Sequence, residues 1–220
     1  MAEKNPSQTV FGYEAGRKKD CLIGNTWRAV PVTIYATRCP TAGKTVKGPR
    51  LWVRGSVPPY YAYPYGLGGE VASSSGAAVT LERAADAANF KVGDQVAVFK
   101  YASEAFAAQV LKVSSIVEAT GVVTLDTTPT SCVDNDFLVV VSGADCGFIG
   151  SGAVAEANTC VILEDVVIVD NVDQGGKAYI EGTFVQSQIA GITVTPGGGT
   201  AKNIFNVRSN PVLHMIDIDT

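Results

Sequence analysis

Short runs that alternate hydrophobic and polar residues, separated by turns rich in Gly, Asp and Asn, make up most of the chain. A period of two is typical of strands with one buried face. Only the Ala-rich runs 82–89 and 103–108 favour helix. The sequence therefore predicts an all-β fold of small barrel or sandwich modules, with strands at residues 29–37, 50–54, 78–82, 95–100, 107–118, 122–125, 137–141, 161–170 and 177–185.

The stretch from residue 78 to residue 141 holds five of these strands at a spacing that suits a small, partly open barrel. Two of its turns share a pattern, because Asp94 ends Lys-Val-Gly-Asp and Asp136 ends Asp-Asn-Asp, each just before a strand. The carboxylates of Asp94, Asp134 and Asp136 lack the spacing of a calcium loop. We interpret them as turn-forming side chains.

The last third of the chain alternates again. The run 161–170, the glycine-containing turn 173–176 and the run 177–185 together predict a β-hairpin. The later glycines 197–199 have neither the lysine nor the strand-to-helix setting of a phosphate-binding loop, so they are predicted to form a flexible turn.

Tyrosine and proline dominate the segment 57–69, with four tyrosines and three prolines between Pro58 and Gly66. Proline extends the backbone and removes donors, which argues against an internal strand. We predict a subunit-contact loop that presents Tyr60, Tyr61, Tyr63 and Tyr65, since tyrosine offers flat contact area at low entropic cost. The alternatives are that these rings cover the chain's own core or stack on sugars.

The first 30 residues show no regular period and are predicted to form an extended arm that becomes ordered on a partner. Residues 1–54 carry a net charge of +7 and the remainder −11. The basic residues are scattered, which favours an acidic protein partner over nucleic acid, and a solvated basic face is the alternative. Arg17, Lys18, Lys19 and Trp27 are the partner-binding candidates here.

With 220 residues, 46% of them hydrophobic and 17% charged, the chain is long and apolar enough to fold. We divide it into a basic arm with the first strands (1–54), a Tyr/Pro-rich connecting loop (55–76), a barrel-like module (77–145) and a C-terminal hairpin module (146–220). No apolar run suits a membrane span or a signal peptide, so a soluble, non-secreted chain is expected.

Candidate chemistry is sparse. The single histidine, His214, has no Ser, Cys or acid arranged around it, and Glu164 and Asp165 fall on opposite faces of a strand. The five cysteines form no CxxC pair and are interpreted as reduced, buried small residues. We therefore expect no enzyme, no catalytic residue, no metal and no cofactor.

Two sequence phrases carry a resemblance. VGDxVxV…GxVTLD…DxLVVV within residues 89–141, followed by ILEDV…AYIEGTFVQSQI within residues 161–189, resembles head decoration (cement) proteins of tailed double-stranded DNA bacteriophages. This resemblance implies a homotrimer on the capsid surface of the virion, made in the host cytoplasm. It would bind the major capsid protein, with no nucleic acid or membrane partner, and clamp capsid subunits against the pressure of packaged DNA.

Two other classes remain open at this point. A carbohydrate- or receptor-binding module on a virion surface would use the tyrosines of segment 57–69 as a stacking platform. A capsid or tail-tube subunit would polymerise alone, whereas a decoration protein stays a small oligomer until it meets a shell.

Overall fold

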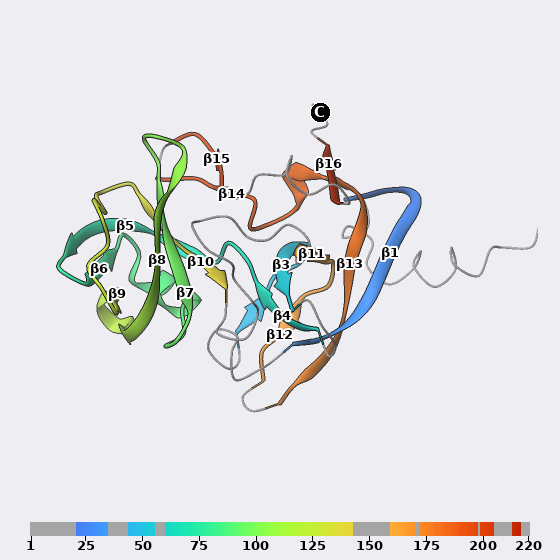
Figure 1. The fold of residues 1–220 in the computed structure, drawn as a ribbon, viewed down its shortest axis with the longest axis horizontal. Helices are drawn as coiled ribbons and strands as arrows, with labels where there is room; N and C mark the ends of the chain where they lie inside the picture. Colours follow the sequence, from blue (N-terminus) through green and yellow to red (C-terminus); the bar gives the residue numbers. More distant parts are fainter. Residues whose placement is uncertain are drawn as a thin grey trace, which may run out of the picture.

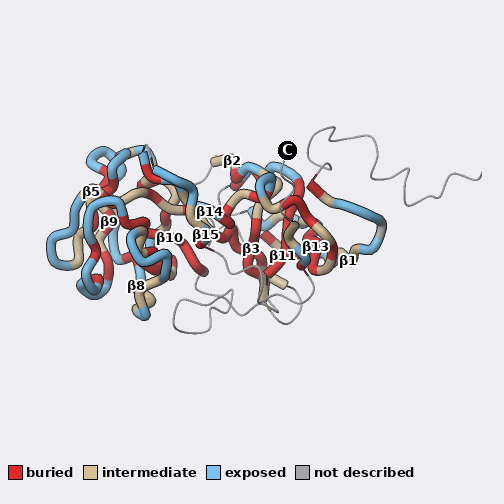
Figure 2. The backbone as a smooth tube through the Cα atoms, turned by 90° about the horizontal axis from the view of Figure 1, so that it is seen from above, coloured by how far each residue is buried: buried red, intermediate tan, exposed pale blue. Residues whose placement is uncertain are grey.

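The computed structural model describes residues 21–34, 44–55, 60–142, 159–169, 172–197, 199–204 and 213–216. Strands dominate these residues, so the predicted all-β fold is confirmed. They form two lobes that lie side by side (Figure 1). We call them the barrel lobe, residues 66–142, and the ring lobe, which is built from strands on both sides of that segment in the sequence. Each lobe has its own buried interior (Figure 2).

The barrel lobe is a closed antiparallel barrel with the strand order β10-β5-β6-β9-β8-β7. The five predicted strands are confirmed with small shifts of their ends. The predicted helical run 103–108 is wrong, because it falls mostly in β8, where Phe106 packs edge-on against Phe99 of β7. The other Ala-rich run contains the 3₁₀ helix η1 (Ala84–Asn89). The strands are β5 (Gly68–Ser75), β6 (Ala78–Leu81), β7 (Gln95–Lys100), β8 (Ala105–Val117), β9 (Val122–Leu125) and β10 (Phe137–Ser142).

The barrel is closed rather than partly open because of β5, a strand that we assigned to the connecting loop. It pairs with β10 on one side and with β6 on the other. A Cβ atom at Gly68 would lie 2.2 Å from the carbonyl oxygen of Leu138, so glycine is what lets β5 approach β10. The Ser-rich end of β5 is exposed and gives little hydrophobic signal.

The ring lobe is built from strands that precede and strands that follow the barrel lobe in the sequence. Its main sheet has the order β1-β4-β3-β11-β13-β16, and β13 pairs with β1 as well, so β1, β4, β3, β11 and β13 close a ring. The barrel lobe is inserted between β4 and β11. These strands are β1 (Leu22–Ile34), β3 (Arg50–Arg54), β4 (Tyr61–Pro64), β11 (Thr159–Ile162), β13 (Gln174–Val185) and β16 (Leu213–Ile216).

Two short strand pairs complete the described fold. Strand β2 (Thr45–Val46) pairs with β12 (Val166–Val167). Strand β14 (Thr193–Val194) pairs with β15 (Lys202–Asn203), and this pair lies next to the barrel lobe (Figure 1).

The Tyr/Pro segment contains an internal strand, which the sequence argument excluded. Strand β4 pairs antiparallel with β3 and parallel with β1. Its proline is tolerated because β1 contacts β4 only at Tyr61 and Ala62, and Pro64 is the last residue of the strand.

The predicted N-terminal arm also extends too far along the chain. Residues 22–30 belong to β1, which pairs along its length with β13. The register shifts twice, between Ile23 and Arg28 and between Arg28 and Ala29, so a bulged region interrupts the period of two, and Gly24 has a φ of 79°. This bulge is why the segment looks irregular in sequence.

The predicted C-terminal hairpin is only partly formed. Its first strand is divided into β11 and β12, and the residues assigned to its turn, Gln174, Gly175 and Gly176, lie inside β13. The Asp165 carboxylate accepts hydrogen bonds from the Gly48 N–H and the Lys47 ammonium, both at 3.0 Å. These bonds draw the chain between β11 and β12 away from β13.

The backbones of Gly66 and Gly191 approach each other closely, and substitutions of glycine can test this packing. Both Gly66 and Gly76 have positive φ, but a Cβ at Gly66 would lie 2.5 Å from the Gly191 backbone, whereas one at Gly76 meets nothing within 4 Å. We expect Gly76→Ala to lower the free energy of unfolding by about 1 kcal/mol. Gly66→Ala should lower it by about 1–3 kcal/mol more, through overpacking. Urea denaturation measures both, and equal losses would contradict this packing.

Candidate functional site

Two of the four predicted contact tyrosines are core residues. Tyr63 and Tyr65 are each 1% exposed. The Tyr63 hydroxyl donates a hydrogen bond to the Asp94 carboxylate, and the Tyr65 hydroxyl donates to the carbonyl of Ile204 at 3.0 Å. The subunit-contact role predicted for these two side chains is therefore corrected, because Tyr63 lies on the internal strand β4, Tyr65 directly follows it, and both rings are part of the chain's own core.

Tyr60 and Tyr61 keep part of their surface. The Arg54 guanidinium lies 5.1 Å from the centre of the Tyr60 ring, and the Tyr60 backbone has a φ of 42°. Both backbone carbonyls accept hydrogen bonds, Tyr60 from Thr33 and Tyr61 from Gly55. The segment is thus held by its main chain, and these two rings are partly buried against the core of the ring lobe.

Trp27 is half-buried in the bulge of β1. Its ring meets Tyr179 edge-on at 5.5 Å, and the Lys177 ammonium lies 5.0 Å from the Trp27 ring and 5.2 Å from the Tyr179 ring. Trp27 therefore combines a packing role with partial exposure. The other basic candidates, Arg17, Lys18 and Lys19, lie outside the described residues.

Asp94 joins the two lobes. It stands in the turn before β7, it is 2% exposed, and its carboxylate accepts hydrogen bonds from the Tyr63 hydroxyl on β4 and from the Lys91 N–H at 2.7 Å. Burial raises the pKa of the Asp94 carboxyl to about 7, although both hydrogen bonds act to lower it. The turn role predicted for Asp94 is confirmed, but its partner across the lobes has no sequence signal.

Asp136 repeats the turn geometry of Asp94. Its carboxylate accepts the N–H of Val133, three residues earlier, at 3.0 Å, just as Asp94 accepts that of Lys91. It also accepts the Tyr101 N–H at 3.2 Å and pairs with the Lys100 ammonium at 2.5 Å. The turn-forming interpretation of Asp136 is confirmed as well.

A second set of bonds attaches the β14–β15 pair to the barrel. The Tyr101 hydroxyl donates to the carbonyl of Thr200 at 3.2 Å and accepts the Thr200 N–H at 3.1 Å. Lys202 pairs with Glu104 at 2.5 Å, and the Gly197 N–H donates to the Glu70 carboxylate at 3.1 Å. The two lobes are therefore fastened at several separate points.

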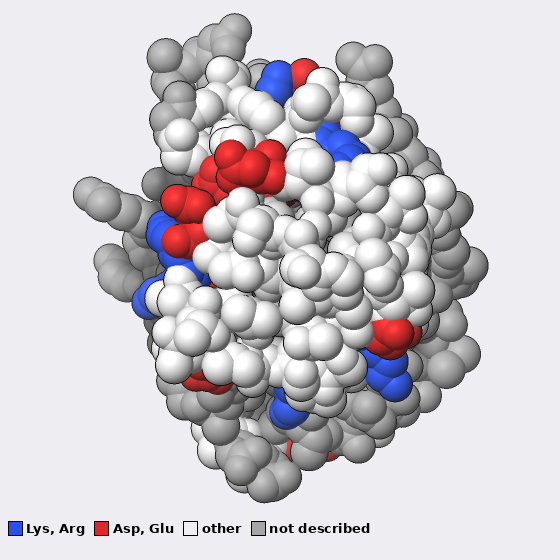
Figure 3. All heavy atoms as spheres, turned by 90° about the vertical axis from the view of Figure 1, so that its left-hand side faces the viewer, with Lys and Arg blue, Asp and Glu red and all other residues white. Residues whose placement is uncertain are grey.

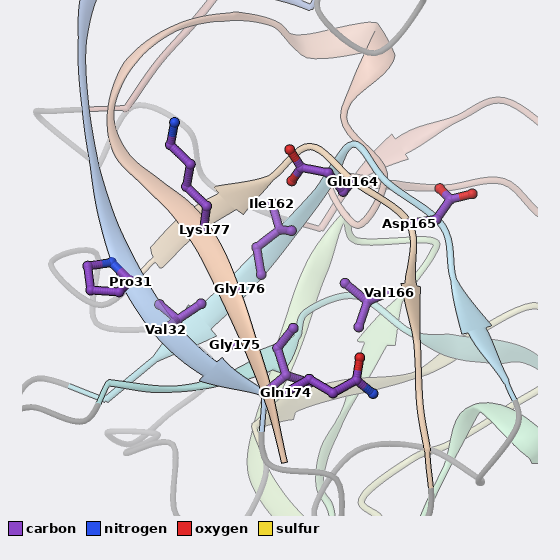
Figure 4. A pocket seen from close by; sticks show the side chains of 11 residues that line it. Pro31, Val32, Ile162, Glu164, Asp165, Val166, Gln174, Gly175, Gly176 and Lys177 are labelled. Atoms are coloured by element: carbon purple, nitrogen blue, oxygen red, sulfur yellow. The ribbon is translucent and has the colours of Figure 1, made fainter. Parts of the chain in front are cut away.

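A pocket of about 480 Å³ lies where β13 and the chain between β11 and β12 separate, and we call it the seam pocket (Figure 4). Aliphatic side chains and two glycines form much of its lining, and charged side chains stand at its rim. The residues are Pro31, Val32, Ile34, Ile162, Glu164, Asp165, Val166, Gln174, Gly175, Gly176 and Lys177.

The outer face of the barrel carries small uncharged side chains in two rows across β5, β6, β9 and β8. Direct strand pairing aligns the members of each row. We call these eight residues the neutral face, and that end of the molecule is mostly uncharged (Figure 3). The rows are Ser75, Ala78, Thr124 and Ser115, and Ser73, Thr80, Val122 and Val117.

The described residues offer little reactive chemistry. In the parts of the chain covered by the structure, no three His, Cys, Asp or Glu side chains gather as a metal site. Cys21, Cys132 and Cys160 are buried, reduced thiols, as predicted, whereas Cys39 and Cys146 fall outside the described ranges. Burial also raises the pKa of the Cys132 thiol to about 11. No helix within the described part is long and apolar enough to cross a bilayer.

Comparison of the chain with protein-family models, with curated proteins and with solved structures gives no match. The functional argument therefore depends on the sequence phrases and on the geometry of the two lobes.

The raised pKa of Asp94 predicts a pH dependence of stability. Between about pH 4 and about pH 7 the folded chain keeps a proton on Asp94 that the unfolded chain releases, so stability falls as pH rises, by up to about 1.4 kcal/mol per pH unit. Asp94→Asn should remove this slope, and Asp134→Asn, a change at an exposed turn carboxylate, should retain it. Urea denaturation from pH 4.5 to pH 7.5 measures the slopes. A wild-type stability that rises with pH through this interval would contradict the assignment.

Proposed function

We propose that this chain is a non-enzymatic structural protein of a phage virion, which binds the outside of the capsid and cements neighbouring capsid subunits. The observation that carries the proposal is the neutral face. Its small side chains lose little rotamer entropy on burial, and it has no charge to strip of water. Such a face suits contact with another protein.

The sequence resemblance supports the same proposal. Its first phrase folds as β7 to β10 of the barrel lobe, and its second spans β11 to β13 of the ring lobe. The fastened lobes would allow the chain to bridge two neighbouring shell subunits without yielding at its own junction. A partner that binds only the assembled shell stabilises it by mass action.

The proposed partner is the major capsid protein, and the proposed state is a homotrimer on the virion surface. Trp27, Tyr60 and Tyr61 are the half-buried aromatic residues proposed for contacts on the ring lobe. Arg17, Lys18 and Lys19 are proposed to add an electrostatic contribution to the same partner.

Cementing predicts a gain in the stability of the shell itself. Adding the purified chain to bare expanded capsids should raise their disruption temperature progressively with concentration, because binding to the assembled shell alone stabilises it by about 2.7 kcal/mol per site at a free concentration of 100 times Kd. Differential scanning calorimetry measures the shift. Saturable binding without a thermal shift would favour a display or receptor-binding role, and polymerisation of the chain alone would favour a capsid or tail-tube subunit.

The neutral face predicts where charge is harmful. The double substitution Ser75→Arg/Ser115→Arg places two cations in one row of this exposed face, and it should weaken shell binding by about tenfold or more because each must be desolvated on contact. Stability should change by less than about 0.5 kcal/mol for each exposed substitution. Ser187→Arg, on the exposed surface of the 3₁₀ helix η4 (Gln186–Gln188), is the control. Sedimentation with capsids measures binding, and equal binding by all variants would exclude this face.

A further inference from the structure

The backbone of β13 offers hydrogen-bonding groups that its neighbours in the ring do not use. Thr33 lies opposite Gly175, and its N–H donates to Tyr60 on the β4 side. The N–H and C=O groups of one strand residue point to the same side, so Thr33 and Gly175 form a non-hydrogen-bonded pair. Gly175 therefore directs its backbone donor and acceptor away from β1, toward the seam pocket.

The same alternation shows which strand belongs on that side. Tyr179 is four residues after Gly175, so its backbone N–H and C=O point to the same side of β13, and on that side Tyr179 pairs with Val161 of β11. Continuing this antiparallel register would bring residue 165 opposite Gly175. The chain leaves that path at residues 163–165, and Gly175 has no backbone partner on this side among the described residues.

Contacts with residues 47 and 48, on the side away from β13, hold residues 163–165 off the path of a continuous strand. The Asp165 carboxylate bonds to Lys47 and Gly48, and a Cβ at Gly48 would lie 2.4 Å from the Glu164 carbonyl oxygen. Glycine thus lets the backbone of Glu164 dock there. One end of the opening is bounded by the Gln174 side-chain amide, which donates to the Val167 carbonyl at 2.5 Å. The seam between β11 and β13 is therefore held open.

We propose that the seam pocket is a strand-addition site, which receives an extended, basic and aliphatic segment of the capsid subunit beside β13. This inference rests on the proposed function for the identity of the partner. An unused N–H and C=O on a strand select an extended peptide backbone, and pockets beside it select side chains.

The lining defines the chemistry of that segment. Val32, Ile162 and Val166 supply an apolar wall for an aliphatic side chain, and a Cβ at Gly175 would meet nothing within 4 Å. The Lys177 ammonium, which also lines the pocket, lies over the Trp27 and Tyr179 rings. The exposed Glu164 carboxylate at the rim therefore suits a lysine or arginine (Figure 4). A volume of about 480 Å³ lies within the range of known small-ligand pockets.

A peptide probe tests the site on the full-length protein, without any shell. The probe is the peptide acetyl-Lys-Val-Thr-Val-Lys-amide. It is titrated into the protein, and NMR records the changes in the protein's backbone amide chemical shifts. We expect saturable shifts centred on Gly175 and Lys177. Methylation of the probe's central backbone nitrogens, or replacement of its lysines by glutamate, should weaken binding by about tenfold.

Two matched glycine-to-leucine variants compare binding of the probe with binding of the capsid shell. Gly175→Leu places a branched side chain beside the backbone groups that the added strand would bond, and Gly197→Leu adds the same side chain at another glycine whose Cβ would meet nothing within 4 Å. Gly175→Leu should lower probe affinity and shell affinity by about tenfold, and Gly197→Leu should leave both unchanged.

The outcomes separate the two proposals. Unchanged probe and shell binding by Gly175→Leu, or shifts centred elsewhere, would overturn the strand-addition site. Probe binding by a wild-type chain that binds no shell would overturn the proposed function and the capsid subunit as occupant. Self-association of the wild type that Gly175→Leu abolishes would assign the pocket to a second copy and overturn the capsid segment.

Discussion

The antiparallel pairing of β1 with β13 is the constraint on which the ring lobe depends. It joins residues near the two ends of the chain, from Leu22 opposite Phe184 to Ile34 opposite Gln174. Without it, the sheet order β1-β4-β3-β11-β13 would be open, and Val32, Ile34 and Ala178 would lose the interior in which they are buried. Loop closure over so long a separation costs entropy, and the extended strand contact offsets it.

Directional polar bonds add to a shared apolar core in fixing the arrangement of the two lobes. A buried carboxylate is costly, and Asp94 is retained where a tyrosine hydroxyl and a backbone N–H both reach it. The Tyr101 and Lys202 contacts constrain the opposite side of the junction. Such directional bonds favour one relative orientation of the lobes, because a hydrogen bond depends on angle more strongly than an apolar contact does.

Local pattern was sufficient for five of the six barrel strands, β6 to β10, since each has a recognisable strand pattern bounded by turn residues. It failed where distant contacts decide the conformation. The bulge interrupts the period of two at the start of β1, and the exposed serines of β5 give no hydrophobic alternation. Pro64 is compatible with β4 only because of how that strand pairs with its neighbours. Of the candidate site residues, Tyr63 and Tyr65 were placed in the wrong environment for the same reason. The seam pocket depends on bonds from Asp165 to residues more than 100 positions away, which no local period reports.

The two ends of the barrel segment are hydrogen-bonded to one another, with Gly66 donating to Val140 and Val140 donating to Leu67 at 3.1 and 2.6 Å. The two connections between the ring lobe and the inserted domain therefore lie side by side, so the ring lobe needs to span only a short distance whatever the length of the insertion. Another domain with adjacent termini could replace this one, at the cost of the hydrogen bonds and apolar contacts between the two lobes. The ring could then persist as a common platform while the exchanged domain diversifies.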